Sequence, residues 1–214
     1  MIDSNLGAKK FGALLFDLDG TLLDSFSTHY AVYEIVFARF GISINKEKFL
    51  NTYSPDWYQT YAAFGLPKKD WESANNYWIE EAEKRTPPLL PCVMDTLIKL
   101  NKSYTLGLVT SGSKSRVFKD LKRTGIEHFF KIIITGDDIQ KPKPAPESIT
   151  SALSSLGVPA REVVYIGDAQ ADYEMARAGG VHFIGVESSF ASLSSNDPGY
   201  SVVSIVDIPE LLEY

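Results

Sequence analysis

Short, continuously apolar segments recur along this chain, and helical patterns lie between them. Five of these segments have the length and composition of β-strands: 13–16, 105–109, 132–134, 163–166 and 182–186. Strands that alternate with helices are typical of βαβ units, which form parallel sheets. Such strands are apolar throughout because helices cover both faces of the sheet. The pattern therefore predicts an α/β fold with a Rossmann-like, doubly wound parallel sheet.

Glycines mark the expected ends of three connecting helices. These helices are predicted over 114–124, 146–156 and 171–178, and the glycines that follow them are Gly125, Gly157 and Gly179. A glycine just after a helix adopts the left-handed conformation at little cost. A short closing helix is expected from Ile208, with Pro209 in its first turn.

The segment between the first two strands is too long for a single crossover and contains only helical patterns. Helices are predicted over 28–40, 46–53, 57–64 and 68–85. We expect most aromatic residues of this segment to fill the core of a small helical bundle. The sequence thus predicts an inserted α-helical cap domain at residues 25–90, over the strand ends of a core domain formed by residues 1–24 and 91–214.

The composition excludes several classes of protein. With 44% hydrophobic and 22% charged residues over 214 positions, the chain has the composition of an ordinary globular protein. A net charge of −6 argues against a surface that coats nucleic acid, since such a surface needs clustered lysine and arginine. We interpret the basic residues of the helix over 114–124, Arg116 among them, as a solvent-exposed face. The single cysteine, Cys92, excludes an intramolecular disulfide and a multi-cysteine zinc site.

Location and assembly are less constrained. No segment approaches the roughly 20 apolar residues of a membrane span, and residues 1–10 lack the apolar region of a secretory signal. We therefore expect a cytoplasmic protein that binds neither membranes nor nucleic acids. A monomer and a homodimer are both compatible with the sequence.

Four aspartates in two pairs follow two of the predicted strands. Asp17 and Asp19 follow the first strand, and Asp168 and Asp172 follow the fourth. The carboxyl ends of parallel strands meet at one edge of the sheet, where ligands bind. Crowded carboxylates repel each other unless a cation compensates them, and a small set of hard oxygen ligands suits Mg²⁺. The sequence therefore predicts a magnesium site at this edge.

The first pair lies in the run Phe-Asp-Leu-Asp-Gly-Thr-Leu-Leu-Asp-Ser at residues 16–25. A carboxylate can attack phosphorus to form an aspartyl phosphate, and this role suits Asp17. Asp19, two positions on, could protonate the leaving oxygen and then deprotonate the attacking water. Gly20 lets the chain turn sharply after the two carboxylates.

With these residues the chain resembles the haloacid dehalogenase-like hydrolase superfamily over nearly its whole length, in particular the branch of phosphoglycolate phosphatases and β-phosphoglucomutases. The resemblance implies that Asp17 is the nucleophile and Asp19 the acid/base. It also implies Mg²⁺ ligands at Asp17, at the backbone carbonyl of Asp19 and at Asp168. Asp172 would support the metal through water or orient its neighbours.

Thr110 follows the second strand and precedes Ser111 and Gly112. Taken alone, this threonine is equally typical of a helix cap. Backbone N–H groups at the start of a helix bind anions well. The resemblance implies that Thr110 binds the phosphoryl group together with the N–H groups of Ser111 and Gly112.

A lysine is expected to balance the negative charge of the nucleophile and the transferring phosphoryl group. Two candidates, Lys141 and Lys143, lie in the stretch 136–147. The resemblance favours Lys143, because Lys-Pro-Ala-Pro-Glu at 143–147 matches the family pattern. Lys141 then lies on the approach to the site, and a shifted register that exchanges the two stays open.

His29 has two interpretations. A histidine in the first helix after the motif is often an ordinary, partly buried side chain. The run from Asp24 to His29 resembles hexose-phosphate phosphatases and β-phosphoglucomutase, where the histidine lies at the cap hinge near the acid/base.

The resulting hypothesis is a Mg²⁺-dependent phosphatase that hydrolyses small phosphomonoesters, of the phosphoglycolate or sugar-phosphate type, through an aspartyl phosphate. Its expected partner is a small phosphorylated metabolite. Two alternatives stay open: a β-phosphoglucomutase-like hexose phosphate mutase, and a non-hydrolytic phosphate-binding or partner-binding protein. The sequence does not identify which phosphomonoester is used.

Overall fold

The computed structural model describes residues 11–52, 57–188, 193 and 199–213. By its internal contacts the chain divides into two compact units. The core unit consists of the described residues of Met1–Asp24 and Pro88–Tyr214, and the helical unit is Ser25–Pro87. Within the described residues, no helix is both long and apolar enough to cross a membrane.

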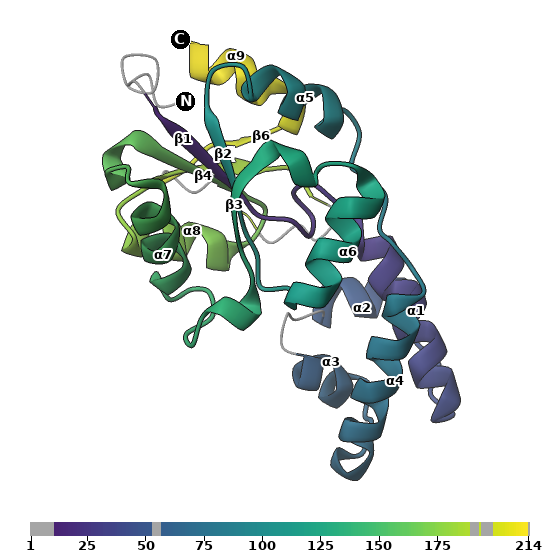
Figure 1. Cartoon of the computed structure of the whole chain (residues 1–214). Helices are drawn as coiled ribbons and strands as arrows, with labels where there is room; N and C mark the ends of the chain where they lie inside the picture. Colours follow the sequence, from purple (N-terminus) through teal and green to yellow (C-terminus); the bar gives the residue numbers. More distant parts are fainter. Residues whose placement is uncertain (1–10, 53–56, 189–192, 194–198, 214) are drawn as a thin grey trace. The chain divides into compact units, whose positions relative to one another are not determined.

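A parallel sheet forms the centre of the core unit (Figure 1). Its strands lie in the order β3-β2-β1-β4-β5-β6, and each pairs in parallel with its neighbour. A helix follows each of the strands β1 to β4 in sequence, so the predicted α/β doubly wound fold is confirmed. The strands are β1 (Ala13–Phe16), β2 (Thr105–Val109), β3 (Phe130–Ile134), β4 (Val163–Gly167), β5 (His182–Val186) and β6 (Val202–Val203).

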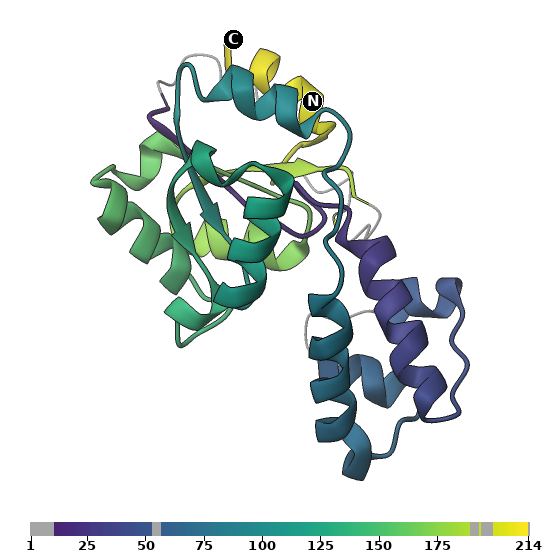
Figure 2. The ribbon, with the colours of Figure 1, turned by 45° about the vertical axis from the view of Figure 1, so that its right-hand side comes forward.

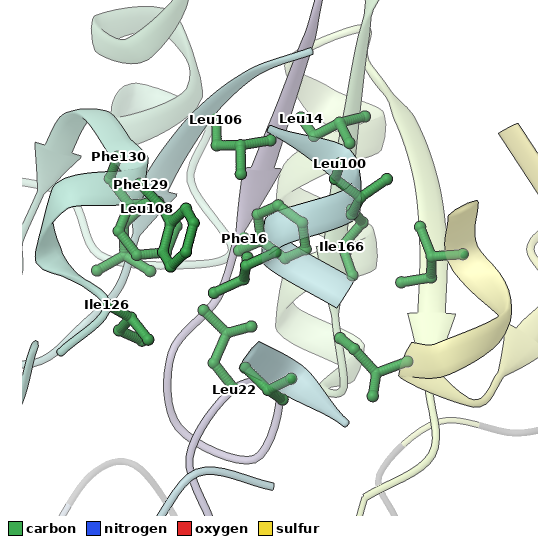
Figure 3. Packing of buried hydrophobic residues seen from close by; sticks show 14 of the residues in the cluster. Leu14, Phe16, Leu22, Leu100, Leu106, Leu108, Ile126, Phe129, Phe130 and Ile166 are labelled. Carbon is green, nitrogen blue, oxygen red and sulfur yellow. The ribbon is translucent and has the colours of Figure 1, made fainter. Parts of the chain in front are cut away.

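Two apolar layers cover the two faces of this sheet. On one face, β1 contributes Leu14 and Phe16 to a cluster with residues of α5 (Val93–Leu100), α6 (Lys114–Thr124) and α9 (Ile208–Glu213). Figure 3 shows Phe16 at the centre of this cluster, with Leu108 and Ile166 near it. On the other face, Ala13 and Leu15 pack with residues of α7 (Glu147–Leu156) and α8 (Gln170–Ala178). Successive strand residues point to opposite faces, so a strand covered on both sides is apolar throughout.

Most predicted elements occur where the sequence indicated. β1, β2, β5 and α6 have the predicted bounds, whereas α7 begins one residue later and α8 one residue earlier. Gly125 and Gly157 adopt φ of +77° and +67° after their helices, as expected of C-terminal glycines. Among the α-helices and strands of the described residues, α5 and the two-residue strand β6 were not predicted.

The helical unit contains α1 (Ser25–Arg39), α2 (Lys46–Thr52), α3 (Trp57–Ala63) and α4 (Trp71–Glu83), with a short 3-10 turn at Lys68–Asp70. Figure 2 shows α1 and α4 side by side, and they contact each other extensively. Aromatic rings form much of the interior: Tyr33, Phe37, Phe49, Tyr61 and Trp78 are buried. The expected aromatic core is therefore present, although Tyr58 is 48% exposed. The role of this unit as a cap stays a prediction.

The sheet topology brings distant segments of the core unit to one edge. Phe16 is level with Leu108 on one side and with Ile166 on the other. The residues that follow these three strands therefore leave the sheet together. The strand order reverses between β1 and β4, and open α/β sheets bind ligands at such a switch point, beyond the carboxyl ends of the strands.

Candidate active site

Asp17 is the first residue beyond β1. Its backbone N–H donates to the carbonyl oxygen of Ile166 at 2.9 Å, which extends the pairing of β1 with β4. The residue is only 7% exposed. Its carboxylate is therefore held by two neighbouring strands at the switch point.

Three carboxylates gather at this edge. One oxygen of each of Asp17, Asp168 and Asp172 lies within 4.8 Å of the others, and all three residues are buried. The hydroxyl of Thr21 donates to Asp168 Oδ1 at 3.1 Å. Asp172 Oδ2 accepts a hydrogen bond from the backbone N–H of Ala169 at 3.1 Å. The two predicted pairs thus meet through three of their four members.

Lys143 places its ammonium among these oxygens. Nζ donates to Asp17 Oδ1 at 2.5 Å, to Asp172 Oδ1 at 2.8 Å and to the hydroxyl of Tyr165 at 2.7 Å. An ammonium has three N–H donors, so these partners use all of them. The Tyr165 hydroxyl in turn donates to the carbonyl oxygen of Val109, at the end of β2, at 2.9 Å.

Lys141, the competing candidate, is exposed. Its backbone N–H donates to Glu147 Oε2 at 2.8 Å, and the N–H of Gln140 donates to Glu147 Oε1 at the same distance. The Glu147 carboxylate therefore fixes the backbone at residues 140–141, just before Lys143. The geometry places Lys143, and not Lys141, against Asp17.

Burial and charge act in opposite directions on the ionisable groups. Burial raises the pKa of Asp17 well above its ordinary value, Lys143 opposes this rise, and Asp172 and Asp168 add to it. Burial, followed by the charge of Asp172, raises the pKa of Asp168 to about 7. Burial disfavours the charge on Lys143, but Asp17 and Asp172 outweigh it and raise the pKa of this lysine. One ammonium thus faces an excess of buried carboxylates.

This excess fits a divalent cation. The donors are hard carboxylate oxygens in small number, which is the ligand set that Mg²⁺ takes in proteins. Gly167 shapes the same place, since a Cβ there would lie 2.5 Å from Asp172 Oδ2. Only a residue without a side chain lets Asp172 approach the end of β4 so closely.

The loop between β2 and α6, residues 110–113, is called the Thr110 loop. Thr110 is 3% exposed, and its hydroxyl accepts the N–H of Gly112 at 3.2 Å. The predicted phosphate donor Gly112 is therefore engaged within the loop in this structure. Asp137 Oδ2 accepts the N–H of Lys114 at 2.8 Å, so a carboxylate of the 3-10 turn Gly136–Asp138 caps α6, and Thr110 does not. Ser111 is exposed between them.

Asp19 is not a member of the group formed by Asp17, Asp168 and Asp172. Gly20 follows it with φ of +84°, as expected for a sharp turn. Arg116 of α6 donates to both carboxylate oxygens of Asp19. The interpretation of Arg116 as part of a solvent-exposed face was wrong, because its side chain is only 15% exposed.

Comparison with known proteins decides the family. Residues 14–186 match the proteins described as haloacid dehalogenase-like hydrolases. The chain belongs to this family. Pyrophosphatase PpaX of Bacillus velezensis is 32% identical to it over 207 residues, which cover 94% of this chain and 95% of that protein. Phosphoglycolate phosphatase of Yersinia pestis is 29% identical over 190 residues, which cover 83% of this chain and 82% of that protein.

The fold agrees with this assignment. A crystal structure of a haloacid dehalogenase superfamily hydrolase, subfamily IA, from Geobacter sulfurreducens superposes with a TM-score of 0.74 at 26% identity. The match covers 99% of this chain and all of that one. The resemblance that the motifs indicated is thus confirmed for the whole described fold.

His29 lies in the helical unit of this haloacid dehalogenase-like hydrolase. It is 7% exposed on α1, and its ring meets that of Trp78 edge to face at 5.5 Å between centroids. This packing is what the ordinary, partly buried interpretation expects. A role at the cap hinge stays a prediction.

Thr21, Tyr165 and Arg116 contact the predicted site residues but were not themselves predicted. A signal existed for Tyr165, because a tyrosine inside an otherwise apolar buried strand needs a partner for its hydroxyl. Thr21 lies next to Gly20, and the turn there brings its hydroxyl to Asp168. For Arg116 the sequence carries no such signal, since basic residues recur along its helix.

Proposed function

We propose that this protein is a Mg²⁺-dependent phosphatase of small phosphorylated metabolites that works through an aspartyl phosphate on Asp17. The observation that carries the proposal is the contact between the Asp17 carboxylate and the Lys143 ammonium, beside Asp168 and the Thr110 loop. A nucleophile, a cation and a set of carboxylate ligands meet at the edge where an α/β sheet binds ligands. Membership of a hydrolase family supports the same conclusion.

Mg²⁺ would be held by the carboxylates of Asp17 and Asp168 and by the backbone carbonyl of Asp19. When bound, it supplies positive charge to the phosphoryl oxygens. Asp172 has a different place, because one of its oxygens accepts from Lys143 and the other from Ala169. Its role is to orient the lysine.

The reaction has two steps. In the first, an Asp17 carboxylate oxygen bonds to phosphorus, the bond from phosphorus to the leaving oxygen breaks, and Asp19 gives that oxygen its proton. In the second, water attacks the phosphorus of the acyl phosphate and gives a proton to Asp19. The bond to Asp17 then breaks and inorganic phosphate leaves. Lys143 and Thr110 stabilise the charge on the phosphoryl oxygens in both steps.

Two substrate classes have support. The relative named phosphoglycolate phosphatase favours a small phosphomonoester. The relative named pyrophosphatase, at 32% identity over nearly the whole chain, favours inorganic pyrophosphate. The same steps serve both, because only the leaving oxygen differs: it belongs to an alcohol in one case and to phosphate in the other.

A phosphate-release screen tests the proposal. The panel contains phosphoglycolate, pyrophosphate, hexose 1-phosphates, hexose 6-phosphates and p-nitrophenyl phosphate, each with Mg²⁺ and with EDTA. We expect phosphate release that requires Mg²⁺. Isomerised hexose phosphate without phosphate release would identify a mutase, and a stable phosphoprotein without release would identify a non-hydrolytic protein.

The carboxylate cluster predicts how stability depends on pH when no divalent cation is bound. The pKa of Asp168 rises from its ordinary 3.8 to about 7 on folding. Between pH 3.8 and about 7, the Asp168 carboxyl group therefore keeps its proton in the folded state but loses it in the unfolded chain. This contribution to stability is complete below pH 3.8 and is lost as the pH rises through about 7. It amounts to a few kcal/mol, at about 1.4 kcal/mol for each pKa unit.

Urea denaturation in EDTA at about pH 5 and about pH 8 measures this loss. Added Mg²⁺ is expected to restore stability mainly at the higher pH, where the carboxylates lack protons. The matched variant Asp168→Asn should lose this part of the pH dependence. Equal pH dependence in the variant and the unmodified protein would contradict the account of the cluster.

A further inference from the structure

Arg116 connects α6 with Asp19, the proposed acid/base. It lies in the first turn of α6, 97 residues from Asp19. Its Nη1 donates to Asp19 Oδ1 at 3.0 Å, and Nη2 donates to Oδ2. Both side chains are largely buried, at 15% and 22% exposed. A two-pronged contact of this kind fixes the plane of the carboxylate as well as its position.

A second carboxylate, that of Asp120, also contacts the Arg116 guanidinium. Asp120, one helical turn further along α6, is 1% exposed and accepts from Arg116 Nη1 at 3.4 Å. Its other oxygen, Oδ1, is buried without a hydrogen-bond partner in the described part of the structure. A buried carboxylate is costly unless a cation stays beside it. Asp120 therefore restrains Arg116 to the inner side of its helix.

The guanidinium also lies against the Thr110 loop. A Cβ on Gly112 would clash with Arg116 Nη2, so the absence of a side chain at Gly112 makes room for the arginine. The same glycine belongs to the loop that would bind the phosphoryl group. Arg116 thus contacts the loop on one side and the acid/base on the other.

These contacts differ from an ordinary surface ion pair. Exposed pairs contribute little because water screens them and both side chains move. Here the arginine is enclosed by Asp19, Asp120 and Gly112, which come from three different places in the core unit. The two oxygens of a carboxylate offer about four acceptor sites. The two hydrogen bonds from Arg116 therefore leave acceptor sites of Asp19 available for proton transfer.

We propose that Arg116 is a positioning residue that fixes the Asp19 carboxylate for proton transfer to the leaving group. The proposal rests on the proposed function, in which Asp19 is the acid/base. It assigns no direct contact between Arg116 and the substrate. Its consequence is that Arg116 matters most for substrates whose leaving oxygen needs a proton.

The test compares leaving groups. kcat/KM is measured for p-nitrophenyl phosphate, whose leaving group departs without a proton, and for phenyl, glycerol and ethyl phosphates, whose leaving oxygens need a proton increasingly in that order. This parameter reports the steps up to the first phosphoryl transfer. For Arg116→Ala we expect about a tenfold to hundredfold loss with the alkyl phosphates and a loss of less than about threefold with p-nitrophenyl phosphate.

Arg116→Lys keeps the charge but not the fork, since a lysine offers a point charge instead of a planar pair of donors. It should show the same dependence on the leaving group as Arg116→Ala. Lys122→Ala, which removes a cation from an exposed position of the same helix, serves as the matched control with an unchanged profile.

Two outcomes would overturn the proposal. An equal loss with every leaving group would show a merely structural role. A rise of KM confined to phosphoglycolate and pyrophosphate, whose leaving groups are anionic, would show that Arg116 binds substrate. The rate of the unmodified protein on p-nitrophenyl phosphate reports the proposed function separately, so the two hypotheses can fail independently.

Discussion

Replacing Asp17 with asparagine will lower turnover by about a thousandfold or more. The amide is nearly isosteric with the carboxylate, so the backbone hydrogen bond from residue 17 to Ile166 is kept while the attacking oxygen loses its charge and its nucleophilicity. Substrate binding should change far less than kcat, because Lys143 and the Thr110 loop stay in place. Phosphate release under saturating Mg²⁺, with the best substrate of the screen, measures the effect.

Asp95→Asn is the matched control for this change. Asp95 is exposed on α5, outside the site, and its variant should retain full turnover. Mass spectrometry of the Asp17→Asn protein must exclude deamidation, which would regenerate aspartate. Turnover that persists in a sample shown to be free of regenerated aspartate would remove Asp17 from the mechanism.

Replacing Lys143 with methionine will lower kcat by about a hundredfold to a thousandfold. Methionine keeps most of the volume of the lysine stem but leaves Asp17 and Asp172 without their shared cation. The variant should also unfold more easily at about pH 8 than at about pH 5, because protons compensate the carboxylates at lower pH. Turnover and urea denaturation at both pH values measure the two effects.

Lys141→Met provides the matched control, because this exposed lysine lies two residues away and engages Glu147 through its backbone N–H. Its turnover and stability should stay close to those of the unmodified protein. The opposite result, a large loss with Lys141→Met and a small one with Lys143→Met, would show that the shifted register is correct.

The helices and strands that could be predicted from the sequence are marked by patterns in their own residues. The strand Ala13–Phe16 is apolar on both faces, and Gly125 ends α6 in the left-handed conformation. Helix α5 also carried a signal, since Val93, Leu97 and Leu100 have helical spacing and are buried, but the nearby prolines and Cys92 obscured its start. Strand β6 has two residues, which is too short for any periodic pattern.

The residues of the candidate site likewise fall into those that the sequence could bring together and those that it could not. Asp17, Thr110 and Asp168 follow strands, so the rule for parallel sheets was enough to bring them together. The environment of Asp19 was not accessible in this way, because it depends on which face of α6 turns inward. Basic residues surround Arg116 in the sequence, and only the packing of α6, with Asp120 and Val117 buried, selects the inner face. Tertiary packing therefore decided what the local pattern left open.

The most direct test of the central claim is a crystal structure with Mg²⁺ and beryllium trifluoride, which mimics a phosphoryl group bonded to a carboxylate. We predict that the beryllium bonds to an oxygen of Asp17, with the ion ligated by Asp17 and Asp168 and with Lys143 against the fluorines. A beryllium adduct on another carboxylate, or an ion bound away from Asp168, would contradict the account.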